Sequence, residues 1–136
     1  MRKIYVRNLT KTGFDSGFLK NIVRNICQIR RIEQKEIGII LLDDKKIQRY
    51  NLRYRGVNRP TDVLAFPVDE RTGELFISLE SARRQAEIYH QSLKKELSLL
   101  IIHGLLHFNG YKDTDRKSRL VMRKEEKNIL NLLRKP

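Results

Sequence analysis

The chain has 136 residues, the size of one domain with a single hydrophobic core, and 40% of them are apolar, which excludes an intrinsically disordered tail. Its charge is unbalanced, with 29 lysines and arginines against 16 acidic residues and a formal net charge of +13. Because such an excess works against a compact fold, it favours a polyanionic partner, with nucleic acid as the first candidate. A thermophile surface would explain the 33% of charged residues but not their imbalance.

The first elements are a strand, expected over residues 2–8, and a helix whose apolar residues recur at helical spacing over 18–27. Asp15 or Ser16 is expected to cap that helix. Cys27 lies in the apolar stripe of the helix, so we interpret it as a core residue rather than a nucleophile. It is the only cysteine, and an internal disulfide is therefore excluded.

The next segment, 38–42, is a short apolar run typical of a strand buried on both faces. Asp43 and Asp44 follow it and are expected to cap a polar helix that ends near Arg53. Glycine and proline punctuate residues 56–61, which are therefore expected to form a loop.

Two further strands are expected at 62–67 and 74–78, joined as a hairpin through the turn at 69–73. Helical periodicity then extends over 81–108, with room for one break near Gln91.

A last helix is expected over residues 116–133. Its expected inner residues are Leu120, Val121, Ile129, Leu130 and Leu133.

The order of elements, β-α-β first and helices last, with no repeat and no long linker, predicts one α/β (α+β) domain over residues 1–136. Its sheet should be small, mixed and mostly parallel, around a central buried helix that carries a metal site.

No segment is expected to enter a membrane. The longest apolar stretch, 97–108, contains two histidines and is well short of the roughly 20 residues that a transmembrane helix needs. The first ten residues contain no apolar core of the kind found in signal peptides. Together with the single cysteine, these features predict a cytoplasmic protein.

Residues 99–108 form the most informative pattern for function. Seven of the ten are large and apolar and surround the helix on every side, which predicts a buried helix. His103 and His107 are four residues apart, so their imidazoles share one face and can bind one metal ion. Two core histidines are the alternative, at the cost of burying imidazoles without partners. Gly104 costs the helix about 1 kcal/mol relative to alanine, which indicates that another element approaches closely there.

A metal ion needs further ligands. Gly110 is expected to end the helix, and the turn that follows can carry Asp113 back towards the histidines. Asp115 is the alternative ligand, since one of the two aspartates is expected to cap the last helix instead. His90 lies 13 residues before His103, several helical turns away, and is interpreted as a surface residue.

Residues 103–113, His-Gly-Leu-Leu-His-Phe-Asn-Gly-Tyr-Lys-Asp, resemble the signature His-Gly-x-Leu-His-Leu-x-Gly-Tyr-Asp-His of the YbeY family. From about residue 36 onward the rest of the chain fits the same family, in residues 52–55, 59–67, 73–78, Met122, Glu126 and 129–130. The resemblance implies a bacterial single-strand-specific endoribonuclease that matures ribosomal RNA, especially the 3′ end of 16S rRNA, and assists ribosome quality control. It also implies two partners, ribosomal RNA and the ribosome or its small subunit.

In the family, the three signature histidines hold zinc, and the resemblance carries the ligand positions onto His103, His107 and Asp113. The third position departs from the signature, because Asp113 stands where the family has histidine and Lys112 where it has aspartate. Two histidines and a carboxylate still suit a catalytic zinc site, and they also match the facial triad that binds ferrous iron. We therefore expect one Zn²⁺ per chain, with Fe²⁺ or another divalent metal as the alternative.

Arg55 corresponds to the family's loop arginine and is expected to be catalytic, because a guanidinium can grip phosphate through two parallel hydrogen bonds. No general base is evident, and Glu74 or an RNA phosphate oxygen could accept the proton. Thr61 and Ser78 are interpreted as hydrogen-bonding residues rather than nucleophiles. Two other functions stay open: a non-catalytic RNA-binding assembly factor with a structural metal, and a metallopeptidase. The second is disfavoured because Gly104 stands where such enzymes carry glutamate.

Overall fold

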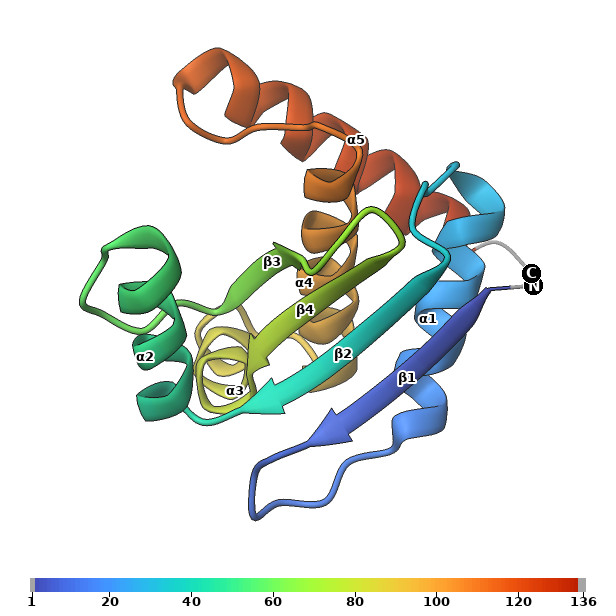
Figure 1. Ribbon diagram of the computed structural model, residues 1–136. Helices are drawn as coiled ribbons and strands as arrows, with labels where there is room; N and C mark the ends of the chain where they lie inside the picture. The colour runs from blue at the N-terminus through green and yellow to red at the C-terminus, as the bar shows by residue number, and fades with distance from the viewer. Residues whose placement is uncertain (1, 135–136) are drawn as a thin grey trace.

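Four strands form one mixed sheet in the order β1-β2-β4-β3 (Figure 1). In this computed structural model, which describes residues 2–134, the strands are β1 Lys3–Asn8, β2 Glu36–Leu42, β3 Val63–Pro67 and β4 Thr72–Ser78. Strands β1, β2 and β4 run parallel, and β3 pairs antiparallel with β4 at the edge of the sheet. The predicted mixed, mostly parallel sheet and the hairpin are therefore confirmed.

The helices cover the sheet unequally. They are α1 Ser16–Ile29, α2 Asp44–Arg55, α3 Leu79–Ile88, α4 Leu93–Phe108 and α5 Arg116–Arg134. The larger hydrophobic core joins one face of the sheet to α1, α3, α4 and α5, whereas α2 alone packs on the other face. Figure 1 shows α1 and α4 behind the sheet and α2 at the end where the parallel strands finish.

Short polar side chains begin the helices, as the sequence predicts. The Asp15 carboxylate accepts a hydrogen bond from the Phe18 amide at the start of α1, and Asp43 caps α2 in the same way. Asp44 has a different role, because its carboxylate accepts hydrogen bonds from the hydroxyls of Ser78 and Ser81. It therefore ties α2 to the end of β4 instead of sharing the cap.

The helical stretch 81–108 is broken near Gln91, as predicted. Helix α3 ends at Ile88, and α4 starts anew after its N-cap Ser92. His90 adopts a positive φ of 52° in the connection and is exposed, in agreement with its assignment to the surface.

Helix α4 packs directly on β4 through Gly104. A Cβ atom at this position would lie 2.5 Å from Leu75 Cδ2, closer than such atoms approach one another. The predicted close approach at Gly104 is thus confirmed, and its partner is a fully buried leucine of the sheet. This contact sets how deeply α4 sits beneath the sheet.

Two of the expected inner residues of the last helix were assigned wrongly. Leu120 and Val121 are 54% and 52% exposed, whereas Met122 and Ile129 are buried. Three consecutive apolar residues left the phase of this helix ambiguous, and contact with α4 selects the face that carries Met122. None of the helices described is both long enough and apolar enough to cross a membrane.

We expect Gly104→Ala to lower the free energy of unfolding. Overpacking a filled core costs about 1–3 kcal/mol, more than the roughly 1 kcal/mol that alanine gains over glycine inside a helix. Urea titration followed by circular dichroism measures the difference. The loss should shrink in a Leu75→Val background, which removes a methylene from the facing side chain, and equal losses in both backgrounds would contradict this explanation.

Candidate metal centre

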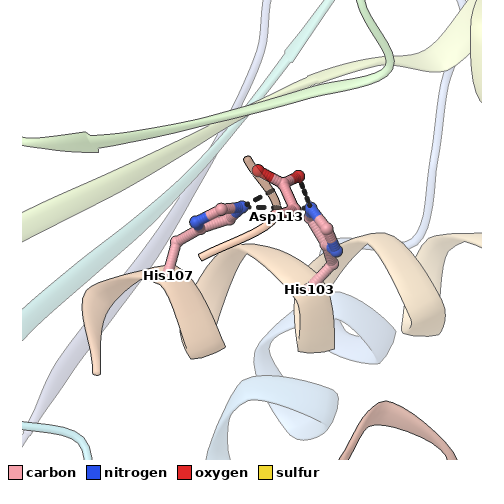
Figure 2. A group of neighbouring side chains, drawn as sticks. All are labelled: His103, His107 and Asp113. Atoms are coloured by element: carbon pink, nitrogen blue, oxygen red, sulfur yellow. Dashed lines mark hydrogen bonds and ion pairs between the residues drawn. The ribbon is translucent and has the colours of Figure 1, made fainter. Parts of the chain in front are cut away.

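Helix α4 brings two imidazoles together one turn apart. The Nε2 atoms of His103 and His107 lie 3.1 Å from each other, and the ring planes are inclined by 77°. Figure 2 shows both rings pointing from the helix towards the same place. Beyond its first turn, α4 is covered by the core on most sides, and these two side chains lie on the part of its surface that stays half-buried.

The turn after α4 carries a carboxylate back to the histidines. Gly110 has a φ of 88°, and its amide donates to the His107 carbonyl while the Tyr111 amide donates to the Leu106 carbonyl. This pair of bonds is the Schellman motif, in which glycine accepts the left-handed conformation. The chain therefore reverses, and Asp113 Oδ2 lies 3.4 Å from His103 Nε2 and 3.6 Å from His107 Nε2.

The three donor atoms have the spacing that a small divalent ion requires. Ligand atoms at about 2.0–2.2 Å from a tetrahedral ion lie about 3.3–3.6 Å from one another. The distances among His103, His107 and Asp113 are 3.1, 3.4 and 3.6 Å. Nitrogen and carboxylate donors also suit zinc or ferrous iron. Together the three residues form a group that could hold a metal ion.

A second carboxylate orients the first imidazole. Glu126 on α5 places Oε1 2.9 Å from His103 Nδ1, and its side chain is only 18% exposed. A carboxylate behind a ligating histidine fixes the ring and directs the lone pair of the other nitrogen towards the ion. Glu126 therefore positions His103 without belonging to the ligand group.

The two imidazoles differ in proton affinity. Burial alone would lower the pKa of His103, but the hydrogen bond and charge of Glu126, aided by Asp113 and Asp62, outweigh it and raise that pKa. Burial and the neighbouring His103 lower the pKa of His107, against the opposing effect of Asp113. The pKa values of the two imidazoles are therefore shifted in opposite directions, and a metal ion would bind the neutral form of each ring.

Arg55 lines the same pocket as the three-residue group. The pocket has a volume of about 430 Å³, and its wall is completed by residues 61–65 of the loop and of β3. Arg55 ends α2, and its Nη1 lies 3.5 Å from Oδ1 of the buried Asn51. Asn51 Nδ2 also donates to the Arg59 carbonyl at 2.9 Å, which ties the loop to the helix that carries Arg55.

Glu74 lies on the wrong face of the sheet to act as the general base. Its neighbours Gly73 and Leu75 face Phe108 and Gly104 of α4, so Glu74 points to the opposite face. There its Oε2 accepts a hydrogen bond of 2.5 Å from the Tyr5 hydroxyl. The suggestion that Glu74 could take the proton is therefore wrong.

The remaining polar candidates have structural partners. Asp115 accepts a hydrogen bond from the Ser118 amide at 2.7 Å and so caps α5, leaving Asp113 to join the histidines. Ser78 donates to Asp44, and Thr61 lies 3.5 Å from the Asp62 carboxylate. These contacts agree with the interpretation of both hydroxyls as hydrogen-bonding groups.

Sequence reasoning gave no role to three residues around the site, Glu126, Asn51 and Asp62, although Glu126 and Asp62 stand within the family resemblance. Glu126 could have been found, because it lies between Met122 and Ile129 on the inner face of α5, where an acidic residue needs a partner. Asn51 is a polar residue 1% exposed beside an apolar helix face. Asp62 lines the pocket, and its carboxylate binds the Val63 amide and Gln85.

The fold and site define a small α/β protein with a group of two histidines and one aspartate that could bind a metal ion. A family model described as Endoribonuclease YbeY matches residues 6–134. The Endoribonuclease YbeY of Heliobacterium modesticaldum is 38% identical over 116 residues, covering 73% of this chain and 70% of the relative. That of Persephonella marina is 37% identical over 120 residues, covering 82% and 78%.

The solution structure of TM1509 from Thermotoga maritima has a similar fold. It matches with a TM-score of 0.62 at 26% identity, over 98% of this chain and 92% of that one. The chain belongs to the Endoribonuclease YbeY family, as the resemblance in its sequence predicts.

We expect Asp113→Ala to weaken metal binding at least tenfold, the lower end of what even an outer-sphere partner contributes. Asp115→Ala is the matched control, since it removes a cap worth about 1 kcal/mol of stability and should leave metal affinity unchanged. Competition with a chromogenic chelator measures both. Metal loss in the Asp115 variant alone would place the third ligand two residues later than Asp113.

Glu126→Ala should lower metal affinity by about 10- to 100-fold, because it releases the His103 ring. The neighbouring Glu125 pairs with Arg30 instead, so Glu125→Ala provides a control of equal charge change. The same chelator competition compares the two variants. Equal affinities would mean that packing alone orients His103.

Proposed function

We propose that this protein is a metal-dependent endoribonuclease that cuts single-stranded ribosomal RNA, acting in maturation of the 16S rRNA 3′ end and in ribosome quality control. The observation that carries the proposal is the shared pocket, in which Arg55 and the group of His103, His107 and Asp113 line one cavity. A phosphodiester seated there would have both the Arg55 guanidinium and the metal group in the wall around it. The excess of basic residues supplies attraction for the rest of the RNA.

The residues of the pocket have different roles in this proposal. His103, His107 and Asp113 would hold the ion, which would supply a Lewis acid and make hydroxide available near neutral pH. Arg55 binds the phosphoryl oxygens and stabilises the negative charge that grows on them during hydrolysis. Asn51 keeps Arg55 and the neighbouring loop in place.

Zinc is the metal we propose, with ferrous iron or another divalent ion as the alternative. Two imidazoles and one carboxylate form a three-ligand set that leaves a position for water or substrate, as catalytic zinc sites do. The carboxylate at position 113 makes the set harder than three histidines and therefore more tolerant of Fe²⁺.

We propose a single strand as the substrate, in line with the family to which the chain belongs. The pocket, about 430 Å³ in volume, has the size that encloses one small ligand. We also propose that the protein acts in the cytoplasm and that its partner is the ribosome or its small subunit.

Peptide hydrolysis is disfavoured by the packing of α4. A peptidase of the His-Glu-x-x-His type needs a glutamate directly after the first histidine. Here that position is Gly104, where even a Cβ atom would lie 2.5 Å from Leu75. The helix therefore has no room for a general base at this position.

We expect Arg55→Ala to lower RNA cleavage by about 10²–10³-fold while metal content stays near that of the wild type. His107→Ala should lose both metal and activity, because a ligand is gone. Gel-resolved cleavage of single-stranded ribosomal RNA and elemental analysis of the same samples measure the two effects. Arg31→Ala, at a side chain 89% exposed, is the control for loss of one positive charge.

Chelation distinguishes an enzyme from an assembly factor. Cleavage should disappear when the ion is removed and return when zinc is added. RNA binding without metal-dependent cleavage would support the non-catalytic alternative, and casein hydrolysis would support the peptidase.

A further inference from the structure

Tyr54 lies beside the metal pocket, across the edge strand β3. It directly precedes Arg55, and its ring centroid lies 4.4 Å from that of Phe66. Phe66 in turn follows Ala65, and both Arg55 and Ala65 line the pocket. Since alternate residues of a strand face opposite ways, the aromatic pair lies one residue beyond the pocket wall on the α2 side of the sheet.

Neighbouring aromatic rings contact Tyr54, which is also partly exposed to solvent. Tyr50 stacks parallel to it, with an interplanar angle of 6°, and Phe76 contacts both Tyr50 and Phe66. These four rings form the aromatic cluster of α2, in which Tyr54 remains 48% exposed. A ring already held in place loses little conformational freedom when a flat ligand stacks on it.

The surface around this ring is basic. The Arg53 guanidinium lies 6.0 Å from the Tyr54 centroid, and Arg49 is exposed one turn earlier. The single acidic residue of α2, Asp44, is engaged by Arg84 at 2.9 Å. The exposed side of α2 therefore presents positive charge beside a half-exposed tyrosine.

We propose that single-stranded RNA leaves the metal pocket around the edge strand β3 and stacks an unpaired base on Tyr54, while Arg53 and Arg49 bind the flanking phosphates. This inference rests on the proposed function, because it extends the path of the same RNA. Every base has a flat face and every linkage a phosphate, so such a site selects an unpaired strand rather than a sequence. A base within a duplex is not free to stack there, which provides a physical reason for single-strand preference.

Charge favours RNA over a protein partner at this surface. Leu52, on the same helix, is also 48% exposed and would suit an apolar contact. However, the one acidic residue of α2, Asp44, is already paired with Arg84, so the charges of Arg49 and Arg53 have no acidic partner on this helix and favour a polyanion. The arrangement of rings and guanidinium groups matches the needs of a nucleic-acid strand.

Single-turnover cleavage by the metal-loaded protein separates binding from chemistry. We expect Tyr54→Ala to raise the protein concentration that half-saturates cleavage by about 5- to 150-fold, the range for losing one aromatic stacking partner. The limiting rate should change little, because Arg55 and the metal group remain. Tyr54→Leu, which keeps an apolar contact with Phe66 but has no ring, should show the same loss, whereas Tyr54→Phe should not.

RNAs that each lack one base provide the matching test. One of these RNAs should bind the wild-type protein more weakly than intact RNA does, by the factor that Tyr54→Ala causes with intact RNA. The Tyr54→Ala variant should bind that RNA as tightly as it binds intact RNA. Tyr89→Ala, at a tyrosine 67% exposed after α3, is the control and should behave as wild type throughout.

The outcomes separate the two proposals. Equal half-saturating concentrations for Tyr54→Ala and wild type would overturn the stacking site and leave the nuclease proposal intact. Two other results would also overturn the stacking site. One is that a missing base weakens RNA binding equally in wild type and in Tyr54→Ala. The other is that Tyr54→Ala changes only the metal content and the limiting rate. Failure of the metal-loaded wild-type protein to cut any RNA would instead overturn the proposed function.

Discussion

The close contact between Gly104 and Leu75 is the constraint on which the site depends. It brings the backbone of α4 against the side chains of β4, so that the helix is buried on almost every side. The face left over carries His103 and His107. Because the helix cannot move outward without emptying the core, the two imidazoles are held at a constant depth beside the sheet edge. The rigidity that a metal site requires therefore comes from hydrophobic packing.

Two other segments add the carboxylates that complete the candidate metal centre on α4. The left-handed turn at Gly110 reverses the chain within three residues and delivers Asp113, and α5 crosses α4 to bring Glu126 behind His103. The three donor atoms lie 3.1–3.6 Å from one another. Contacts of Glu126 and Asp113 with the imidazoles hold the group together, so an ion would meet donors that are already gathered.

Strand β3 separates two surfaces that a single RNA strand could contact in succession. On one side its residues wall the pocket with Arg55, and on the other Phe66 supports the aromatic cluster of α2. An edge strand suits this role, because a flexible polymer can pass around it, whereas an inner strand would be covered on both sides. In the proposal above, the positive charge of α2 and the half-exposed Tyr54 belong to the path of the substrate.

Local patterns were enough to predict most elements, the caps Asp15 and Asp43, the buried helix with its histidine pair and the close approach at Gly104. These features follow from hydrophobic periods of 3.6 residues in helices or 2 in strands and from the chemistry of single side chains.

Three things were decided only by tertiary structure. The phase of α5 depended on contact with α4, so Leu120 and Val121 were misplaced. The side of the sheet occupied by Glu74 depended on which face α4 covers. The positions of Glu126 and Asn51 depended on partners 23 and 8 residues away in the chain. A ligand pair four residues apart is set by helix geometry, but the groups that orient it come from distant segments, and only packing brings those segments together.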